Sequence, residues 1–225
     1  MDLSITLIIV IITSLVSIGG FNNQKIIDDL IFYPPAVKRG QWYRLVTHGL
    51  IHADGFHLIF NMIALYSFGE AVEKALFSYS CFFGTNGKWI FLLLYITGLI
   101  VASIPDLVKH RDSYHFRSLG ASGAVSAVVF SSILLLPKLG VGLAFIPGIQ
   151  IPGYIFAVLY LIISAYLDKK GGGKVNHGAH LWGAVYGLLF TYIAVNFFTD
   201  INIIENFKEQ LQAPKPFLPS CAVAE

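Results

Sequence analysis

Several separate runs of apolar residues, each close to the length that crosses a lipid bilayer, constrain the fold of this chain more than any other feature. A hydrocarbon core about 30 Å thick needs roughly 20 helical residues, so 225 residues leave room for about six such runs and their loops. Only 12% of the residues are charged, against roughly 25% in an ordinary soluble domain. The sequence therefore predicts an all-α fold, a polytopic membrane helix bundle with six transmembrane helices.

The bounds of the six segments follow from the polar residues, prolines and glycines that interrupt the apolar pattern. We expect spans over residues 3–21, 57–77, 89–104, 120–136, 154–167 and 179–198. Pro105 should end the third. The first is expected to remain as an anchor, because the residues before it lack the positive charge of a signal peptide. Residues 1–198 then form one transmembrane domain, and 199–225 a flexible C-terminal tail.

The loop between the first two spans, about 22–56, is unusually long, which is typical of a segment that is functional or lies against the bilayer. Its Trp42 and Tyr43 are expected to be anchors at the membrane surface. His48 is interpreted as a simple loop residue. His52 is interpreted as a structural hydrogen-bonding residue, with catalysis as the alternative.

Two acidic residues, Glu70 and Glu73, fall near the far end of the second predicted span. Both are expected at the membrane surface, where they would pair with Lys74 or with solvent.

A serine between small residues opens the fourth predicted span, in the motif Gly120-Ala121-Ser122-Gly123. Glycine, alanine and serine are the residues that transmembrane helix contacts prefer, whatever their chemistry. Taken alone, the motif favours close helix packing over catalysis.

A histidine, His180, opens the sixth predicted span, and Gly183 and Gly187 share its helical face at i+3 and i+7. Spans four and six are separated by one span and so run in the same direction, which places Ser122 and His180 at similar depth below the same surface. Polar groups within spans are costly and by default mark function. The glycines would let the two helices approach closely.

The second predicted span runs the same way and carries His57 and Asn61 on one face of its first turns. This set supports acyl transfer, with Ser122 as nucleophile and a neutral His180 as its general base. The His57 ring, the Asn61 amide and a backbone N–H at Ser122 would hold the oxyanion. No carboxylate is placed to orient His180, so the sequence predicts a dyad.

At these residues the chain resembles the rhomboid family of intramembrane serine proteases. The matching motifs are Trp42-Tyr43-Arg44, His52, His57-Leu58-Ile59-Phe60-Asn61, Gly120-Ala121-Ser122-Gly123, and Ala179-His180-Leu181-Trp182-Gly183 with Gly187. The resemblance implies a six-span bundle that cleaves transmembrane segments of other proteins near the membrane surface, without metal or organic cofactor. It also implies the same roles for Ser122, His180, His57 and Asn61, and a mobile fifth span.

The chain departs from the family pattern at two positions. Many relatives have Trp and Arg adjacent in the first loop, whereas here Tyr43 intervenes. Many also have a tyrosine four residues after the nucleophile, stacked on the catalytic histidine, whereas this chain has Ser126. Trp182 or tight packing at Gly183 would then orient His180.

The expected partners are bilayer lipids and transmembrane protein substrates, and the formal charge of +2 is too small to imply nucleic acid. We predict a multi-pass protein of a bacterial inner membrane. The family orientation, with both termini cytoplasmic, puts ten of the fifteen Lys and Arg residues in outer loops, which opposes the positive-inside rule.

Three alternatives stay open. The first is a catalytically inactive rhomboid-like scaffold that binds transmembrane helices. The second is a transporter or channel, although that class favours acidic residues at midspan or broken-helix repeats. His177 and His180 at i and i+3 could form a metal pair, but the Glu of a metalloprotease motif does not follow.

Overall fold

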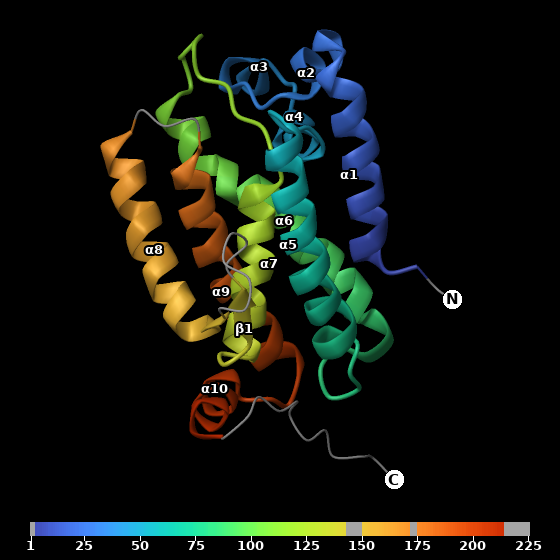
Figure 1. Cartoon of the computed structure of the whole chain (residues 1–225), viewed down its shortest axis with the longest axis vertical. Helices are drawn as coiled ribbons and strands as arrows, with labels where there is room; N and C mark the ends of the chain where they lie inside the picture. Colours follow the sequence, from blue (N-terminus) through green and yellow to red (C-terminus); the bar gives the residue numbers. More distant parts are fainter. Residues whose placement is uncertain (1–2, 143–149, 172–174, 214–225) are drawn as a thin grey trace.

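The structure, a computed structural model, describes residues 3–142, 150–171 and 175–213 as a bundle of helices (Figure 1). Its helices are α1 (Ile5–Phe21), α2 (Gln24–Leu30), α3 (Pro34–Lys38), α4 (Arg44–Thr47), η1 (His48–Leu50), α5 (Gly55–Glu70), η2 (Ala71–Phe77), η3 (Gly84–Asn86), α6 (Gly87–Lys109), α7 (Ser122–Leu135), α8 (Gly153–Lys170), α9 (His177–Phe198) and α10 (Ile203–Gln212). The predicted helical bundle is confirmed.

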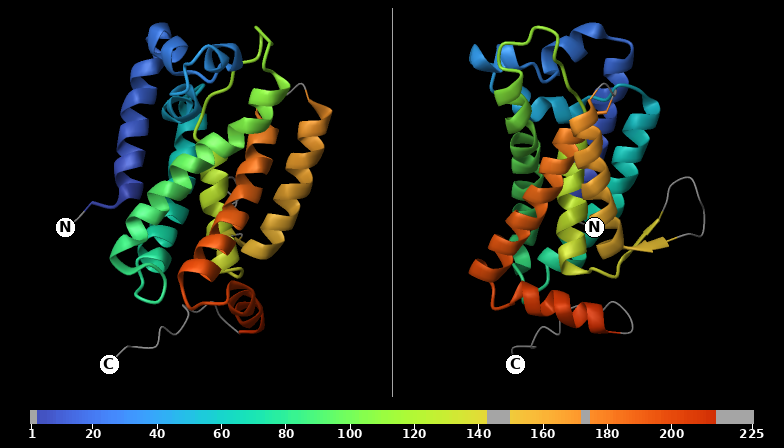
Figure 2. Two further views of the ribbon diagram at one scale, coloured as in Figure 1. Left: turned by 180° about the vertical axis from the view of Figure 1, so that it is seen from behind. Right: turned by 90° about the vertical axis from the view of Figure 1, so that its left-hand side faces the viewer.

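Helix α7 forms the core of the bundle. Every residue of α7 is buried except Ser122 and Leu134, because α5, α6 and α9 pack around it. Helices α1 and α8 lie on the outside (Figures 1 and 2). A helix enclosed in this way can carry hydroxyl groups within a membrane if they find partners, and Thr191 Oγ1 of α9 donates to Ser131 Oγ at 2.7 Å.

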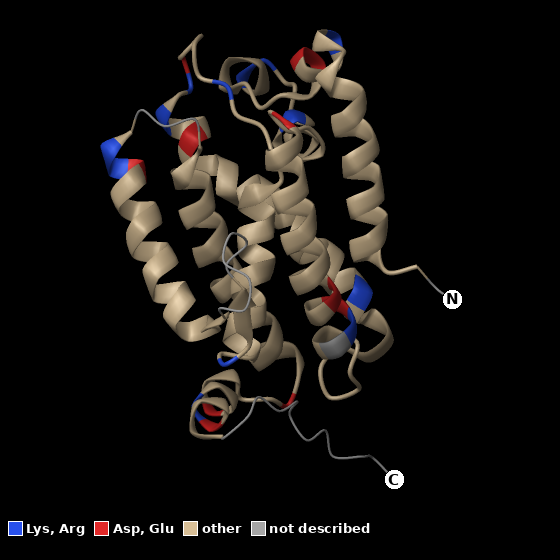
Figure 3. Ribbon diagram, in the orientation of Figure 1, with Lys and Arg blue, Asp and Glu red and all other residues tan. Residues whose placement is uncertain are grey.

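The distribution of charge fits a protein that crosses a membrane. Lys, Arg, Asp and Glu gather at the two ends of the bundle, and the region between them is almost free of these residues (Figure 3). Among the described residues, three helical segments are long and apolar enough to cross a bilayer, namely Gly55–Lys74, Gly84–Lys109 and His177–Phe198. Helices α1 and α7 are apolar but shorter. Helix α8 has 18 residues, of which the last three, Asp168, Lys169 and Lys170, are charged.

The predicted end of the third span at Pro105 is wrong. Helix α6 continues through Pro105 to Lys109. An interior proline removes its own backbone donor and crowds the carbonyl four residues earlier, but the helix is held beyond it by the bond from His110 N to Asp106 O at 2.8 Å. The Asp106 side chain also accepts from Asn176 Nδ2 at 2.6 Å, so the end of α6 is fixed by a residue distant in sequence.

Strands β1 (Gly140–Gly142) and β2 (Gln150–Pro152) and helix α10 were not predicted. The two strands pair antiparallel in the connection between α7 and α8, and they project from the helices (Figure 2). The segment predicted as a flexible tail contains α10, which lies across the ends of α7 and α9. Its Ile203 is fully buried, and Asn206 Nδ2 donates to Leu135 O at 3.2 Å. The remainder of the predicted tail, 214–225, lies outside the described residues.

A buried carboxylate, Glu73, joins the end of the second span to the beginning of α1. It lies in η2, a π-helical turn that continues α5, and is only 3% exposed. Its carboxylate accepts from Ile5 N at 2.8 Å and from Thr6 N and Oγ1 at 2.7 Å each. The expectation of a surface position is therefore wrong for Glu73, whereas Glu70 does pair with Lys74 at 2.7 Å. Free N–H groups at the start of a helix require such an acceptor where water is absent.

We expect Glu73→Gln to weaken the attachment of α1, because the amide offers one acceptor atom where the carboxylate offers two. Loss of charge-assisted bonds to a buried group should lower the free energy of unfolding by about 1–3 kcal/mol. Thermal unfolding in detergent micelles measures this, with the exposed Glu209→Gln as the control. Equal melting temperatures for the two variants would contradict this role of Glu73.

Candidate active site

Helices α7 and α9 approach each other so closely that their backbones touch. A Cβ atom on Gly183 would overlap the carbonyl oxygen of Gly123, and one on Gly187 would overlap that of Ala127. Successive turns of the two helices are therefore in register, with both helices beginning at the same end of the bundle. The predicted packing glycines lie in this contact.

Ser122 and His180 lie at the N-terminal end of the α7–α9 contact. Ser122 is the first residue of α7, and a Cβ on the adjacent Gly123 would lie 3.5 Å from Ala179 O. The turn that carries His180 thus lies beside the start of α7, and both side chains are partly exposed. Within the described residues, no hydrogen bond joins Ser122 Oγ to His180. The structure brings the two residues to the same level without linking them.

The predicted oxyanion residues come from α5. Asp54 caps this helix by accepting from His57 N at 2.8 Å, which places His57 in the first turn. Gly120 has φ +113°, and a Cβ there would lie 2.7 Å from His57 Cε1. Glycine is therefore required, both for this backbone conformation and for the approach of the ring. Asn61, one turn further, is buried and its Nδ2 donates to His57 O at 2.9 Å.

A relay of hydrogen bonds through His52 fixes the backbone just before Ser122. Ala121 N donates to His52 Nε2 at 3.3 Å, so the ring proton is on Nδ1, which faces Ser17 Oγ at 2.9 Å. The Ser17 hydroxyl in turn donates to Leu50 O at 2.9 Å. The interpretation of His52 as a structural hydrogen-bonding residue agrees with this relay.

His48 is a second fixed point of the first loop, which the sequence interpretation missed. The residue is buried, its carbonyl accepts from Gly120 N at 2.9 Å, and its Nε2 lies 3.1 Å from Ser103 Oγ of α6. The only sequence signal for it is that His48, His52 and His57 lie close together in the chain. Together His48 and His52 hold the two residues that precede the serine.

Asn176 fixes the start of α9 in the same manner. As the N-cap residue, its Oδ1 accepts from Ala179 N at 2.9 Å. Its Nδ2 donates to Asp106 Oδ2 at 2.6 Å and to Ser118 Oγ at 3.2 Å. The helix turn with His180 is thus tied to α6 and to the loop before α7. An asparagine just before an apolar segment is a known signal for the start of a helix. Its partners Asp106 and Ser118 are distant in the sequence and could not be predicted from it.

Arg44, whose place in the family motif differs here, forms hydrogen bonds within the first loop. Its guanidinium donates to Asp28 O and Ile31 O, both at 2.8 Å, and to Gln41 Oε1 at 2.6 Å. The side chain is buried, whereas the neighbouring Tyr43 is 49% exposed, as expected of a surface aromatic.

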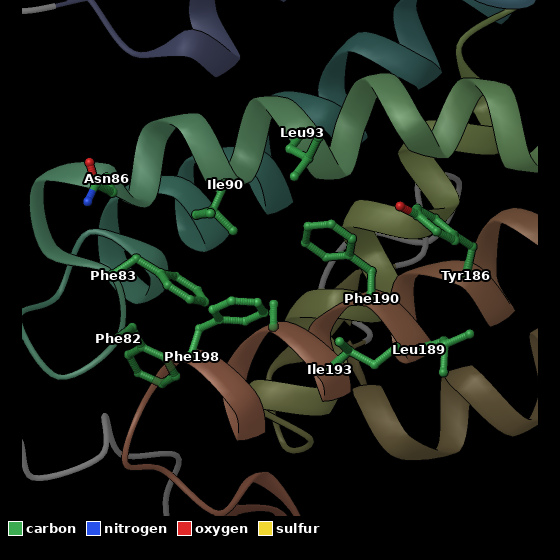
Figure 4. Close-up of a pocket in the computed structure, with 11 residues that line it drawn as sticks. Phe82, Phe83, Asn86, Ile90, Leu93, Tyr186, Leu189, Phe190, Ile193 and Phe198 are labelled. Carbon is green, nitrogen blue, oxygen red and sulfur yellow. The ribbon is translucent and has the colours of Figure 1, made fainter.

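An apolar pocket among the described residues lies away from this site. It has a volume of about 600 Å³ between the first half of α6 and the second half of α9. Phenylalanine rings, among them Phe83, Phe190 and Phe198, point into it (Figure 4). Because Ser122 and His180 lie at the opposite end of α9, the pocket is not part of the candidate site. In the described ranges, no group of three potential metal-binding side chains occurs.

The fold and the site define a helix bundle of the membrane-spanning class, with a serine and a histidine at the same end of two packed helices. Comparison with known proteins gives the family. Residues 39–197 match the family model of the Rhomboid domain, and the chain belongs to the rhomboid family. It is an integral membrane protein.

Three similar proteins illustrate the range of this family. RHOMBOID-like protein 12, mitochondrial, of Arabidopsis thaliana is 27% identical over 73% of this chain. Rhomboid protease GluP of Bacillus subtilis is 30% identical over 69%, and Rhomboid protease GlpG of Haemophilus influenzae is 25% identical over 84%. The chain spans 50%, 29% and 90% of the lengths of these three proteins, respectively.

The stability of the protein should fall in weak acid because of the two loop histidines. Burial lowers the pKa of His48 to about 4 and that of His52 to about 3, while an unfolded histidine has a pKa of about 6.5. Since the folded pKa is the lower one, their contribution is complete above about pH 6.5 and is lost as the pH falls toward 4. Each histidine adds a slope of up to about 1.4 kcal/mol per pH unit.

Unfolding in detergent between pH 7 and pH 4.5 checks this. The slope of stability against pH should become shallower in His48→Gln and in His52→Gln, and should persist in the exposed control His115→Gln. Parallel slopes in all the proteins would refute the assignment to the loop histidines.

The α7–α9 contact makes a second prediction. In Gly183→Ala the new methyl group must push the Gly123 carbonyl away, so overpacking should cost about 1–3 kcal/mol of unfolding free energy. Gly55→Ala is the matched control, because a Cβ there meets nothing within 4 Å. Equal melting temperatures for Gly183→Ala and Gly55→Ala would show that the two backbones are not in contact.

Proposed function

We propose that this protein is an intramembrane serine endopeptidase that hydrolyses peptide bonds in or near transmembrane segments of other membrane proteins. The observation that carries the proposal is the backbone contact of α7 and α9, which sets Ser122 beside the turn bearing His180. The names of two of the relatives, GluP and GlpG, as rhomboid proteases support it. Ser122 and His180 act as the dyad.

In this mechanism His180 takes the proton of Ser122 Oγ while that oxygen attacks the carbonyl carbon of the scissile bond. The tetrahedral oxyanion is held by the His57 ring, the second N–H of the Asn61 amide, and the backbone N–H of Ser122. Ala53 N faces His57 Nδ1 at 3.5 Å, which leaves Nε2 to carry the proton toward Gly120. The imidazolium returns its proton to the leaving amine, and water then releases the acyl group from Ser122.

The lengths of the helices suit hydrolysis inside a bilayer. We assign α1, α5, α6, α7, α8 and α9 as six spans of one domain. Helix α7 has 14 residues and is therefore about 21 Å long, less than the roughly 30 Å of the hydrocarbon core. Its N-terminal Ser122 is thus recessed below the surface, beneath the first loop. A bacterial inner membrane is the proposed location.

An inactive scaffold that binds transmembrane helices is the alternative. The observation that favours it is that Ser122 Oγ and His180 are not hydrogen-bonded in the part of the chain described. Catalytic hydrogen bonds in ligand-free enzymes are often long and tighten only with substrate, so the geometry is compatible with the dyad.

Labelling by a fluorophosphonate and cleavage of a model transmembrane substrate together distinguish the protease from the inactive scaffold. The purified protein should be phosphonylated at Ser122, and Ser122→Ala and His180→Ala should each lower cleavage by at least about a thousandfold. Both variants should remain folded in detergent, with His115→Gln as an active control. A protein that binds the substrate but neither reacts nor cleaves is a scaffold.

A further inference from the structure

The His180 ring stacks on a side chain of α8. The Tyr160 ring lies nearly parallel to the imidazole, with an interplanar angle of 21° and ring centroids 6.4 Å apart. This is within the range of offset-stacked aromatic pairs. Trp182, the residue suggested by the sequence, is 46% exposed and lies two residues further on the helix, where side chains do not face each other.

The Tyr160 ring is itself held by the helix that carries the serine. Its hydroxyl lies 2.6 Å from Ser126 Oγ, one turn after Ser122 on α7, and Ser126 is only 5% exposed. In a membrane interior each of these hydroxyl groups needs a partner, because an unsatisfied one is costly. The bond therefore fixes both the ring of Tyr160 and the local distance between α8 and α7.

Two phenylalanines also pack against the Tyr160 ring. Phe130 of α7 packs at 5.3 Å and Phe156 of α8 at 5.5 Å between ring centroids. His177 meets His180 edge-on at 5.9 Å from within α9. One face of the His180 ring is thus stacked toward α8. The residue before it, Ala179, donates its backbone N–H to the N-cap residue Asn176.

We propose that Tyr160 is the positioning residue of the dyad: stacked on His180 and bonded to Ser126, it aims the imidazole at Ser122. This inference rests on the proposed function. It follows that the base is correctly aimed only while α8 is packed against α7. A movement of α8 away from the bundle would withdraw the ring from His180 and slow the chemical step.

The test compares variants that remove the ring with variants that remove only its anchor. The rate of Ser122 phosphonylation by a fluorophosphonate and the kcat and KM for a model transmembrane substrate are measured. Tyr160→Leu should lower the labelling rate and kcat by about tenfold or more, with KM changed by less than about threefold. Tyr166→Leu, on the exposed side of α8, is the matched control and should react like the unmodified protein.

A double-mutant cycle tests the anchor. Tyr160→Phe and Ser126→Ala remove the two ends of one hydrogen bond, so each should slow labelling by a similar, smaller factor of about threefold to tenfold, and the double variant should be no slower than either. These conservative variants keep the ring and the packing, so the cycle remains informative if Tyr160→Leu fails to fold. Simple multiplication of the two factors, or normal labelling in both variants, would overturn the proposal.

The outcomes separate this inference from the proposed function. If the unmodified protein does not react, or reacts equally well in His180→Ala, the dyad itself is wrong. If labelling requires His180 but Tyr160→Leu is folded and reacts at the normal rate, only the positioning role of Tyr160 fails.

Discussion

The contact between the backbones of α7 and α9 is the constraint on which the rest of the structure depends. With glycine at 123, 183 and 187, the two helices meet without intervening side chains, and van der Waals packing of this kind is what associates helices in a bilayer. Because helix turns then stand in fixed register, the first residue of α7 faces the first turns of α9. The arrangement of Ser122 and His180 is thus a consequence of helix packing and does not require a bond between them.

Several buried polar groups of the bundle form hydrogen bonds with residues that also determine its geometry. His48 and His52 bind the backbone of Gly120 and Ala121, Asn176 ties α9 to α6, and Glu73 receives the first N–H groups of α1. In a medium without water each such bond replaces one that solvent would otherwise supply. The long first loop is therefore a structural part of the site, fastened to α1, α6 and α7.

The apolar helices, and the placement of Ser122 and His180 in the first turns of two of them, could be predicted because hydropathy and the helical period are local properties of the sequence. The identity of the partners could not. Pro105 does not end α6, since Asn176 binds the side chain of the next residue, Asp106, which is seventy residues away from it in the chain. Glu73 is a charged residue of the kind usually found at the surface, but it is buried against α1. Nothing near Ser126 in the sequence indicates Tyr160, because the two meet only when α8 packs on α7.

A crystal structure of the protein phosphonylated at Ser122 tests the central claim most directly. The account predicts that the His180 ring lies within about 3 Å of the Ser122 Oγ or a phosphonyl oxygen, that His57 faces the oxyanion position, and that the glycine contacts of α7 and α9 persist. A phosphonylated serine with His180 turned away, or with another helix between the two residues, would contradict it.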